Sequence, residues 1–117
     1  MSDIFRRQQV GEYTVIEFVT PSLMDPIILE NTAQALYKVV DEEGHRKIVM
    51  DFERVQYLSS QAIGIVLAMH KKLNSLKDSR LVLCSVGPKL MELIKLTRLD
   101  RLLTIKPTRQ DAVAVLQ

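Results

Sequence analysis

Two short apolar runs constrain the fold of this 117-residue chain more than any other feature. The segments 47–52 and 80–85 are nearly continuous in apolar side chains, without the strict alternation of a half-exposed strand. Such runs are typical of parallel strands that are covered on both faces of a sheet. Because parallel strands need long crossover connections, usually helices, we expect an α/β fold.

The segments around these runs predict alternating helices and strands. Residues 4–10 and 12–19 indicate two strands joined at Gly11, which predicts an antiparallel hairpin. Asp25 is expected to cap a helix that begins at Pro26 and ends near Gly44. The apolar stripe of this helix comprises Leu29, Ala33, Leu36, Val39 and Val40. The later elements are predicted as a helix at about 60–76, a helix from Pro88 to about Leu96 and a strand at 102–105. A last helix is predicted from Thr108, with Val113 and Leu116 as the side chains that pack it against the rest of the domain.

The predicted order is therefore β-β-α-β-α-β-α-β-α, in one domain that spans residues 1–117. It implies a mostly parallel sheet with an N-terminal antiparallel hairpin and helices packed on it. Gly64 lies inside the helix at 60–76, where glycine lowers helix stability. The first half of that helix is apolar nearly all round, so we expect it to lie deeply against the sheet, with a close approach at Gly64.

Composition narrows the classes of function. The first 66 residues carry six basic and ten acidic side chains, whereas residues 67–117 carry ten basic and four acidic ones. The basic residues of the second half indicate either solvated helix faces or, as the more specific interpretation, a surface that binds an acidic partner. No aromatic residue interleaves with it, so we expect no direct nucleic-acid binding. No apolar window is long enough to span a membrane and the N-terminus does not resemble a signal peptide, so we expect a cytoplasmic protein.

The chain offers few groups for metal or cofactor chemistry. His45 and His70 are isolated in the sequence, and the four glycines are too far apart to form a phosphate-binding loop. Cys84 is the single cysteine and lies in an apolar run, which favours a buried, inert thiol. Asp51 ends a strand, and without clustered acidic neighbours we expect it to form a turn or cap rather than bind a metal. We therefore expect no metal, no cofactor and no enzymatic activity.

The pair Ser59–Ser60 follows a strand and begins a helix, which is where functional sites gather in parallel sheets. The plain interpretation is an N-cap, in which a serine hydroxyl accepts a hydrogen bond from an early helical N–H. The functional alternative is phosphorylation, because the free N–H groups and dipole at a helix N-terminus tolerate a phosphate. A phosphate there would leave the fold intact and repel a partner that fits a neutral hydroxyl.

The segment 49–67, VMDFERVQYLSSQAIGIVL, resembles the signature of STAS domains, the bacterial anti-sigma factor antagonists. The segment 93–105 and the closing Asp111-Ala112-Val113 are similar to later parts of that family, so the likeness covers nearly the whole chain. By resemblance, Ser60 stands at the family's phosphorylated serine. The family's preceding Asp, following Ser or Thr, and first Gly are replaced by Ser59, Gln61 and Ala62, while the second Gly is retained as Gly64.

The resemblance implies a partner-switching regulator. The unphosphorylated domain would bind an anti-sigma factor that is also a serine kinase and so free the sigma factor. Phosphorylation at Ser60 would break that complex, and a metal-dependent serine phosphatase would restore it. The expected partner-binding residues are Asp51, Ser59, Ser60, Gln61 and Gly64.

Two other functions stay open from the sequence. One is a non-phosphorylated STAS subunit of a signalling scaffold or a membrane transport complex. The other is an enzyme that uses Ser59 or Ser60 as a nucleophile, although no base stands at a fixed spacing from either serine.

Overall fold

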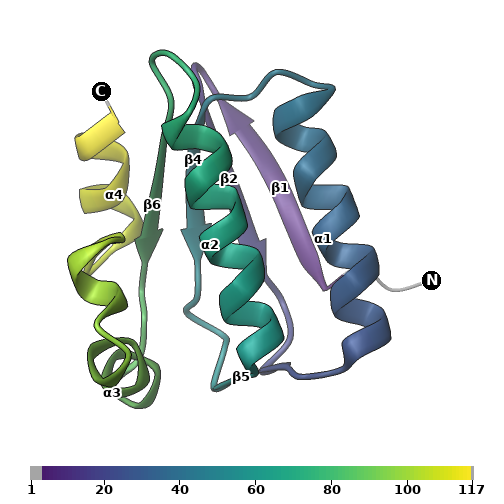
Figure 1. The fold of residues 1–117 in the computed structure, drawn as a ribbon. Helices are drawn as coiled ribbons and strands as arrows, with labels where there is room; N and C mark the ends of the chain where they lie inside the picture. The colour runs from purple at the N-terminus through teal and green to yellow at the C-terminus, as the bar shows by residue number, and fades with distance from the viewer. Residues whose placement is uncertain (1–3, 117) are drawn as a thin grey trace.

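A computed structural model describes residues 4–116 and shows an α/β fold built on one five-stranded sheet (Figure 1). The strand order is β1-β2-β4-β6-β7. Only the β1–β2 pair is antiparallel, and the other three pairs are parallel. The strands are β1 (Phe5–Val10), β2 (Tyr13–Phe18), β4 (Lys47–Asp51), β6 (Arg80–Cys84) and β7 (Thr104–Lys106). This arrangement confirms the predicted hairpin followed by a parallel sheet.

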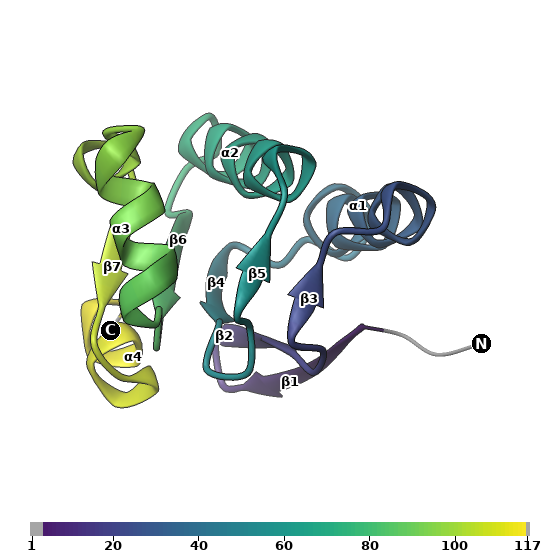
Figure 2. The same ribbon diagram turned by 90° about the horizontal axis from the view of Figure 1, so that it is seen from below.

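Helices cover both faces of the sheet, as Figure 2 shows. On one face lie α1 (Pro26–Asp41) and α2 (Ser60–Asn74), whose buried side chains join the main core around Ile16, Ile48 and Met50. On the other face α4 (Arg109–Leu116) buries Ala112 and Leu116. The side chains that α4 covers are Val15, Val49, Val82 and Cys84. The α3 helix (Pro88–Leu96) packs Leu90 and Ile94 into the main core.

The start of α1 follows the sequence prediction. The Asp25 carboxylate accepts hydrogen bonds from the N–H groups of Ile27 and Ile28 at 2.9 and 3.1 Å, and Pro26 is the first helical residue. These bonds satisfy two of the donors that a helix N-terminus leaves free. The predicted apolar stripe is fully buried, and Gly44 adopts a left-handed φ of 74° just beyond the helix.

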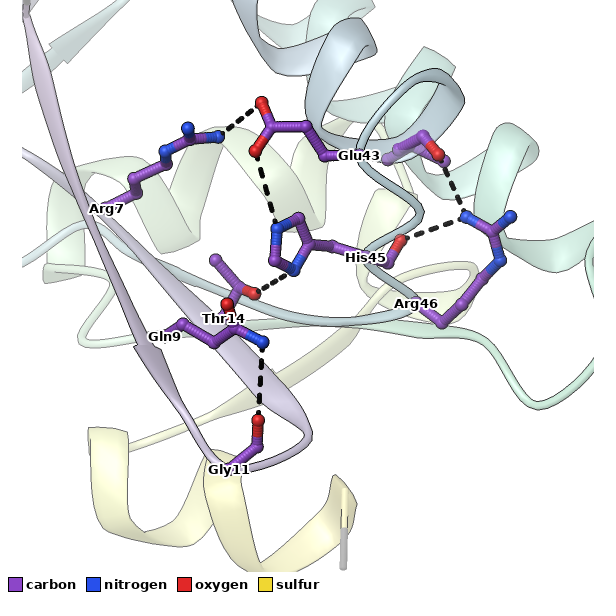
Figure 3. Close-up of polar contacts among 8 residues, drawn as sticks. Arg7, Gln9, Gly11, Thr14, Glu43, His45 and Arg46 are labelled. Atoms are coloured by element: carbon purple, nitrogen blue, oxygen red, sulfur yellow. Dashed lines mark hydrogen bonds and ion pairs between the residues drawn. The ribbon is translucent and has the colours of Figure 1, made fainter.

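A polar network holds the hairpin against the connection between α1 and β4 (Figure 3). The buried Thr14 hydroxyl lies 2.9 Å from Nδ1 of His45, and Nε2 of His45 lies 3.6 Å from the carboxylate of Glu43. Arg7 on β1 donates a hydrogen bond to the same carboxylate at 2.7 Å. His45, which is isolated in the sequence, is thus part of a structural network at the end of the sheet opposite to Ser60.

Two short elements were absent from the sequence prediction. The strands β3 (Ser22–Leu23) and β5 (Tyr57–Leu58) form a separate two-stranded parallel sheet. Each is only two residues long, and therefore carries no periodic pattern that a sequence could display.

The last strand was predicted two residues too early. Leu99–Arg101 forms a single turn of 3-10 helix, η1, and the N–H of Leu103 donates to the carbonyl of Leu99 at 2.8 Å. The apolar pair Leu102 and Leu103 therefore belongs to a helical turn that buries Leu103, and β7 begins at Thr104.

The expectation for Gly64 was wrong. A Cβ placed on Gly64 would meet no atom within 4 Å, and the residue is exposed. The helix α2 turns Ala62, Ile65 and Val66 toward the core, so only part of its apolar first half is deeply buried. Gly64 instead lies on the outward face of α2.

Within residues 4–116, no helix combines the length and the apolar character needed to cross a membrane.

Candidate functional site

Ser59 and Ser60 have different roles at the start of α2. The hydroxyl of Ser59 accepts a hydrogen bond from the N–H of Ala62 at 3.2 Å, which makes Ser59 the N-cap. Ser60 is the first helical residue and is exposed, and its hydroxyl has no hydrogen-bond partner among the described residues. The predicted cap is therefore confirmed, and the hydroxyl-bearing Ser60 beside it is exposed.

The small sheet of β3 and β5 fixes the position of this turn. Ser22 pairs with Tyr57 and Leu23 with Leu58, and the N–H of Ser59 donates to the carbonyl of Leu23 at 3.1 Å. The side-chain amide of Gln61 donates to the carbonyl of Pro26 at 3.1 Å. These contacts bring the N-terminal ends of α1 and α2 together next to the β3–β5 pair.

Exposed apolar side chains occur on the segments that adjoin the start of α2. Ile27 is 75% exposed, and Met24, Tyr57 and Ile28 are 50%, 51% and 44% exposed. All four belong to the segments that the β3–β5 pair and the Gln61 hydrogen bond connect to Ser60. We call Met24, Ile27, Ile28, Tyr57 and Ser60 the Ser60 face.

A cluster of this kind on a surface indicates an interaction site. The sequence analysis missed the apolar members of the Ser60 face. The available indication was that Ile27 and Ile28 lie outside the apolar stripe of the helix that begins at Pro26.

Asp51 was expected among the partner-binding residues, but its side chain is only 2% exposed. One carboxylate oxygen accepts two hydrogen bonds from Arg109, at 3.0 Å from Nε and 2.7 Å from Nη2. The other oxygen accepts from the N–H of Glu53 at 2.9 Å, which confirms the predicted turn-forming role. Asp51 thus points away from the Ser60 face, toward α4, so direct contact of its side chain with a partner does not fit this arrangement.

Arg109 is the residue that the sequence analysis did not identify. It lies at the start of α4, 58 positions from Asp51, so no local pattern connects the two. The hydrogen bonds to Asp51 raise the pKa of the guanidinium above its ordinary value, and Glu17 at 3.8 Å acts in the same direction. The pair attaches α4 to the end of β4.

The remaining expected site residues gather on α2. Gln61 and Gly64 are exposed on the first two turns of the helix, next to Ser60. The structure therefore brings Ser59, Ser60, Gln61 and Gly64 together and separates them from the buried carboxylate of Asp51.

Two further predictions concern reactive groups. Cys84 is buried, and burial together with the nearby charge of Asp51 raises the pKa of its thiol to about 11, which disfavours the nucleophilic thiolate. Within residues 4–116 no three His, Cys, Asp or Glu side chains are grouped so that they could hold a metal ion.

The sequence profile of the STAS domain matches residues 11–112 of this chain. The chain belongs to the STAS domain family. Among curated proteins, BtrV of Bordetella bronchiseptica, a candidate anti-sigma factor antagonist, is 29% identical over 73 residues. That match covers 62% of this chain and 62% of BtrV, less than two thirds of the length of the curated relative.

Solved STAS structures share the fold. An anti-sigma factor antagonist domain protein from Planctomyces limnophilus superposes with a TM-score of 0.84 at 24% identity, over 97% of both chains. The phosphorylated form of the Bacillus cell-fate determinant SpoIIAA superposes with a TM-score of 0.74 at 20% identity, over 97% of this chain and 99% of SpoIIAA.

Proposed function

We propose that this STAS domain is an anti-sigma factor antagonist that works by partner switching at Ser60. In its unphosphorylated form it binds an anti-sigma factor serine kinase and so frees the sigma factor. Phosphorylation of Ser60 releases the kinase, and a serine phosphatase restores binding. The kinase supplies ATP and catalytic metal, and this domain supplies only the hydroxyl and the docking surface.

The observation that carries the proposal is the position of Ser60. Ser60 is exposed at the N-terminus of α2, its hydroxyl has no hydrogen-bond partner within residues 4–116, and exposed apolar side chains lie on the adjoining segments. The existence of a phosphorylated form of SpoIIAA, which has a similar fold, supports the same interpretation.

A phosphate at Ser60 would act on the partner rather than on the fold. It adds a charge of about −1.5 to −2 at neutral pH. The charge would stand beside Ile27 and Tyr57, so a partner that covers these side chains would have to desolvate it. The Ser59 cap is a separate hydroxyl, so the helix start does not depend on the modified residue.

The test uses the anti-sigma factor kinases of the source cell, each purified and measured by calorimetry against the full chain. Ser60→Asp should abolish binding to the cognate kinase and leave the thermal midpoint unchanged. Gln110→Glu is the matched control, because it adds one negative charge at an exposed position of α4 on the other face of the sheet. It should leave binding intact.

Incubation with the cognate kinase and ATP should place one phosphate on the 57–71 segment, read by mass spectrometry. Ser60→Ala should remove that phosphate, whereas Ser59→Ala should not. Kinase binding that survives Ser60→Asp would contradict the proposal and favour the non-phosphorylated scaffold role. The replacement of the family's Asp by Ser59 makes the choice of kinase the specific point that this experiment examines.

A further inference from the structure

A second exposed apolar surface lies on a different element from the Ser60 face. Leu96, at the end of α3, is 76% exposed, and Leu102, just after η1, is 50% exposed. Figure 2 looks onto the end of the sheet and shows α3 on one side of β5 and α1 on the other. Leu96 and the Ile27–Ile28 pair are therefore carried by separate helices, α3 and α1.

Basic residues lie next to both leucines in the sequence, and the exposed Asp100 lies between the leucines. Lys95, Arg98 and Arg101 are exposed, and none of them lies within 4 Å of a carboxylate in the part of the chain that the structure describes. Residues 88–102 carry four basic and two acidic side chains. We call Lys95, Leu96, Arg98, Arg101 and Leu102 the α3–η1 surface.

Arg98, on this surface, has an uncommon backbone conformation that Asp78 and Ser85 share. Its backbone is left-handed, with φ 61° and ψ 20°, at the turn that joins α3 to η1. Glycine is the ordinary residue at such a helix end, because a side chain with a Cβ is strained there. The strain at Arg98 therefore supports a role for its cationic side chain only together with the exposed leucines of the same segment.

The unit that displays these side chains is anchored from within. Leu90 and Ile94 of α3 are buried, and Leu99 of η1 packs against the main core. The exposed leucines are therefore presented on a fixed support, as a docking surface requires.

From this arrangement we infer that the α3–η1 surface binds an acidic, amphipathic segment of a protein partner. Apolar side chains of that segment would cover Leu96 and Leu102, and its carboxylates would reach Lys95, Arg98 and Arg101. Charge complementarity selects an acidic partner. No aromatic residue occurs after Tyr57, so the surface lacks the stacking platform that single-stranded nucleic acid requires. This inference does not depend on the switch at Ser60.

The experiment titrates three synthetic 16-residue peptides into the ¹⁵N-labelled full chain and follows the backbone amides by NMR. The first peptide alternates leucine at helical spacing with glutamate, the second replaces each glutamate by lysine, and the third replaces each leucine by serine. The first should shift the amides of residues 95–102 and bind more weakly as salt increases. The other two should bind at least about tenfold more weakly, because each lacks one of the two complementary features.

Two variants test the residues, with a matched control. Leu96→Ser should weaken the acidic peptide by roughly tenfold, the loss expected when one leucine is no longer buried. Ile27→Ser removes an aliphatic side chain of nearly equal exposure from the Ser60 face and should leave the peptide affinity unchanged. Arg98→Gly should weaken the peptide a few-fold while the thermal midpoint stays the same or rises, because glycine relieves the left-handed strain. A side chain with only a structural role would not lower affinity while stability rises.

Several outcomes would overturn the inference. These are peptide-induced shifts confined to residues 24–28 and 57–60, an unchanged affinity for Leu96→Ser, or tighter binding of a DNA duplex or of anionic lipid vesicles than of the acidic peptide. Ser60→Asp should not change the peptide affinity. A failure of partner switching at Ser60 would therefore be distinguishable from a failure of this second surface.

Discussion

The pair formed by Asp51 and Arg109 allows a prediction whose size follows from the structure. Replacing Arg109 by Met removes both hydrogen bonds to one oxygen of a carboxylate that is 2% exposed. Removing one partner of a buried ion pair costs about 3 to 5 kcal/mol, because the remaining charge stays buried. The Arg109 side chain is 39% exposed, so water can reach part of the vacated position. We therefore expect a loss of about 2 to 3 kcal/mol in the free energy of unfolding.

Urea unfolding followed by circular dichroism at pH 7 measures this loss. The decisive comparison is the double variant, in which Asp51→Asn removes the buried charge that Arg109→Met leaves unpaired. Asn retains an oxygen that can accept from the N–H of Glu53. We expect the double variant to recover about 1 kcal/mol or more relative to Arg109→Met alone. A double variant that is no more stable than the single one would show that the unpaired charge is not the cause, and would refute the reasoning.

Three smaller predictions concern the helix termini and the polar network. Ser59→Ala should lower the free energy of unfolding by about 1 kcal/mol in urea melts, because the N–H of Ala62 loses its cap; an unchanged midpoint would contradict the capping role. Gly64→Ala should raise the free energy of unfolding by about 0.5 to 1 kcal/mol, because the position is helical, exposed and open to a Cβ; a lower urea midpoint would count against the outward placement of Gly64. The hydrogen bond from Arg7 lowers the pKa of Glu43 below its ordinary 4.5, so this contact stabilises the fold above that value and loses its effect as the pH falls through the lowered pKa. The stability difference between the parent chain and Arg7→Ala should therefore shrink between pH 7 and pH 3, and a difference that stayed constant would argue against the ionic contact.

Much of the fold could be predicted because its main elements carry local patterns. The buried strands 47–52 and 80–85 are apolar on both faces, and Asp25 and Pro26 mark the start of α1 in the sequence itself. The β3–β5 pair could not be predicted, because two residues define no period. At Leu102 and Leu103 the apolar pattern suited a strand, but the hydrogen bond from Leu103 to Leu99 extends the preceding helical turn.

In the candidate site, too, some residues could be located from the sequence and others could not. Ser59 and Ser60 could be located from the sequence because capping and the start of a helix are local events. The burial of Asp51 depends on Arg109, 58 residues away, and only the folded chain brings the two together. Ile27 and Ile28 carry no sign of exposure as residue types, and the one indication in the sequence is that both lie outside the apolar stripe that α1 turns to the core.

The strand order has a consequence for how the chain assembles. After the β1–β2 hairpin, each strand of the large sheet pairs beside the strand that precedes it in that sheet, from β2 to β4, β6 and β7. No strand has to insert between two that are already paired. A chain that emerges from the ribosome N-terminus first could therefore extend the sheet at one edge. The last helix, α4, covers side chains of β2, β4 and β6, so this face of the sheet is closed only after all five strands have formed.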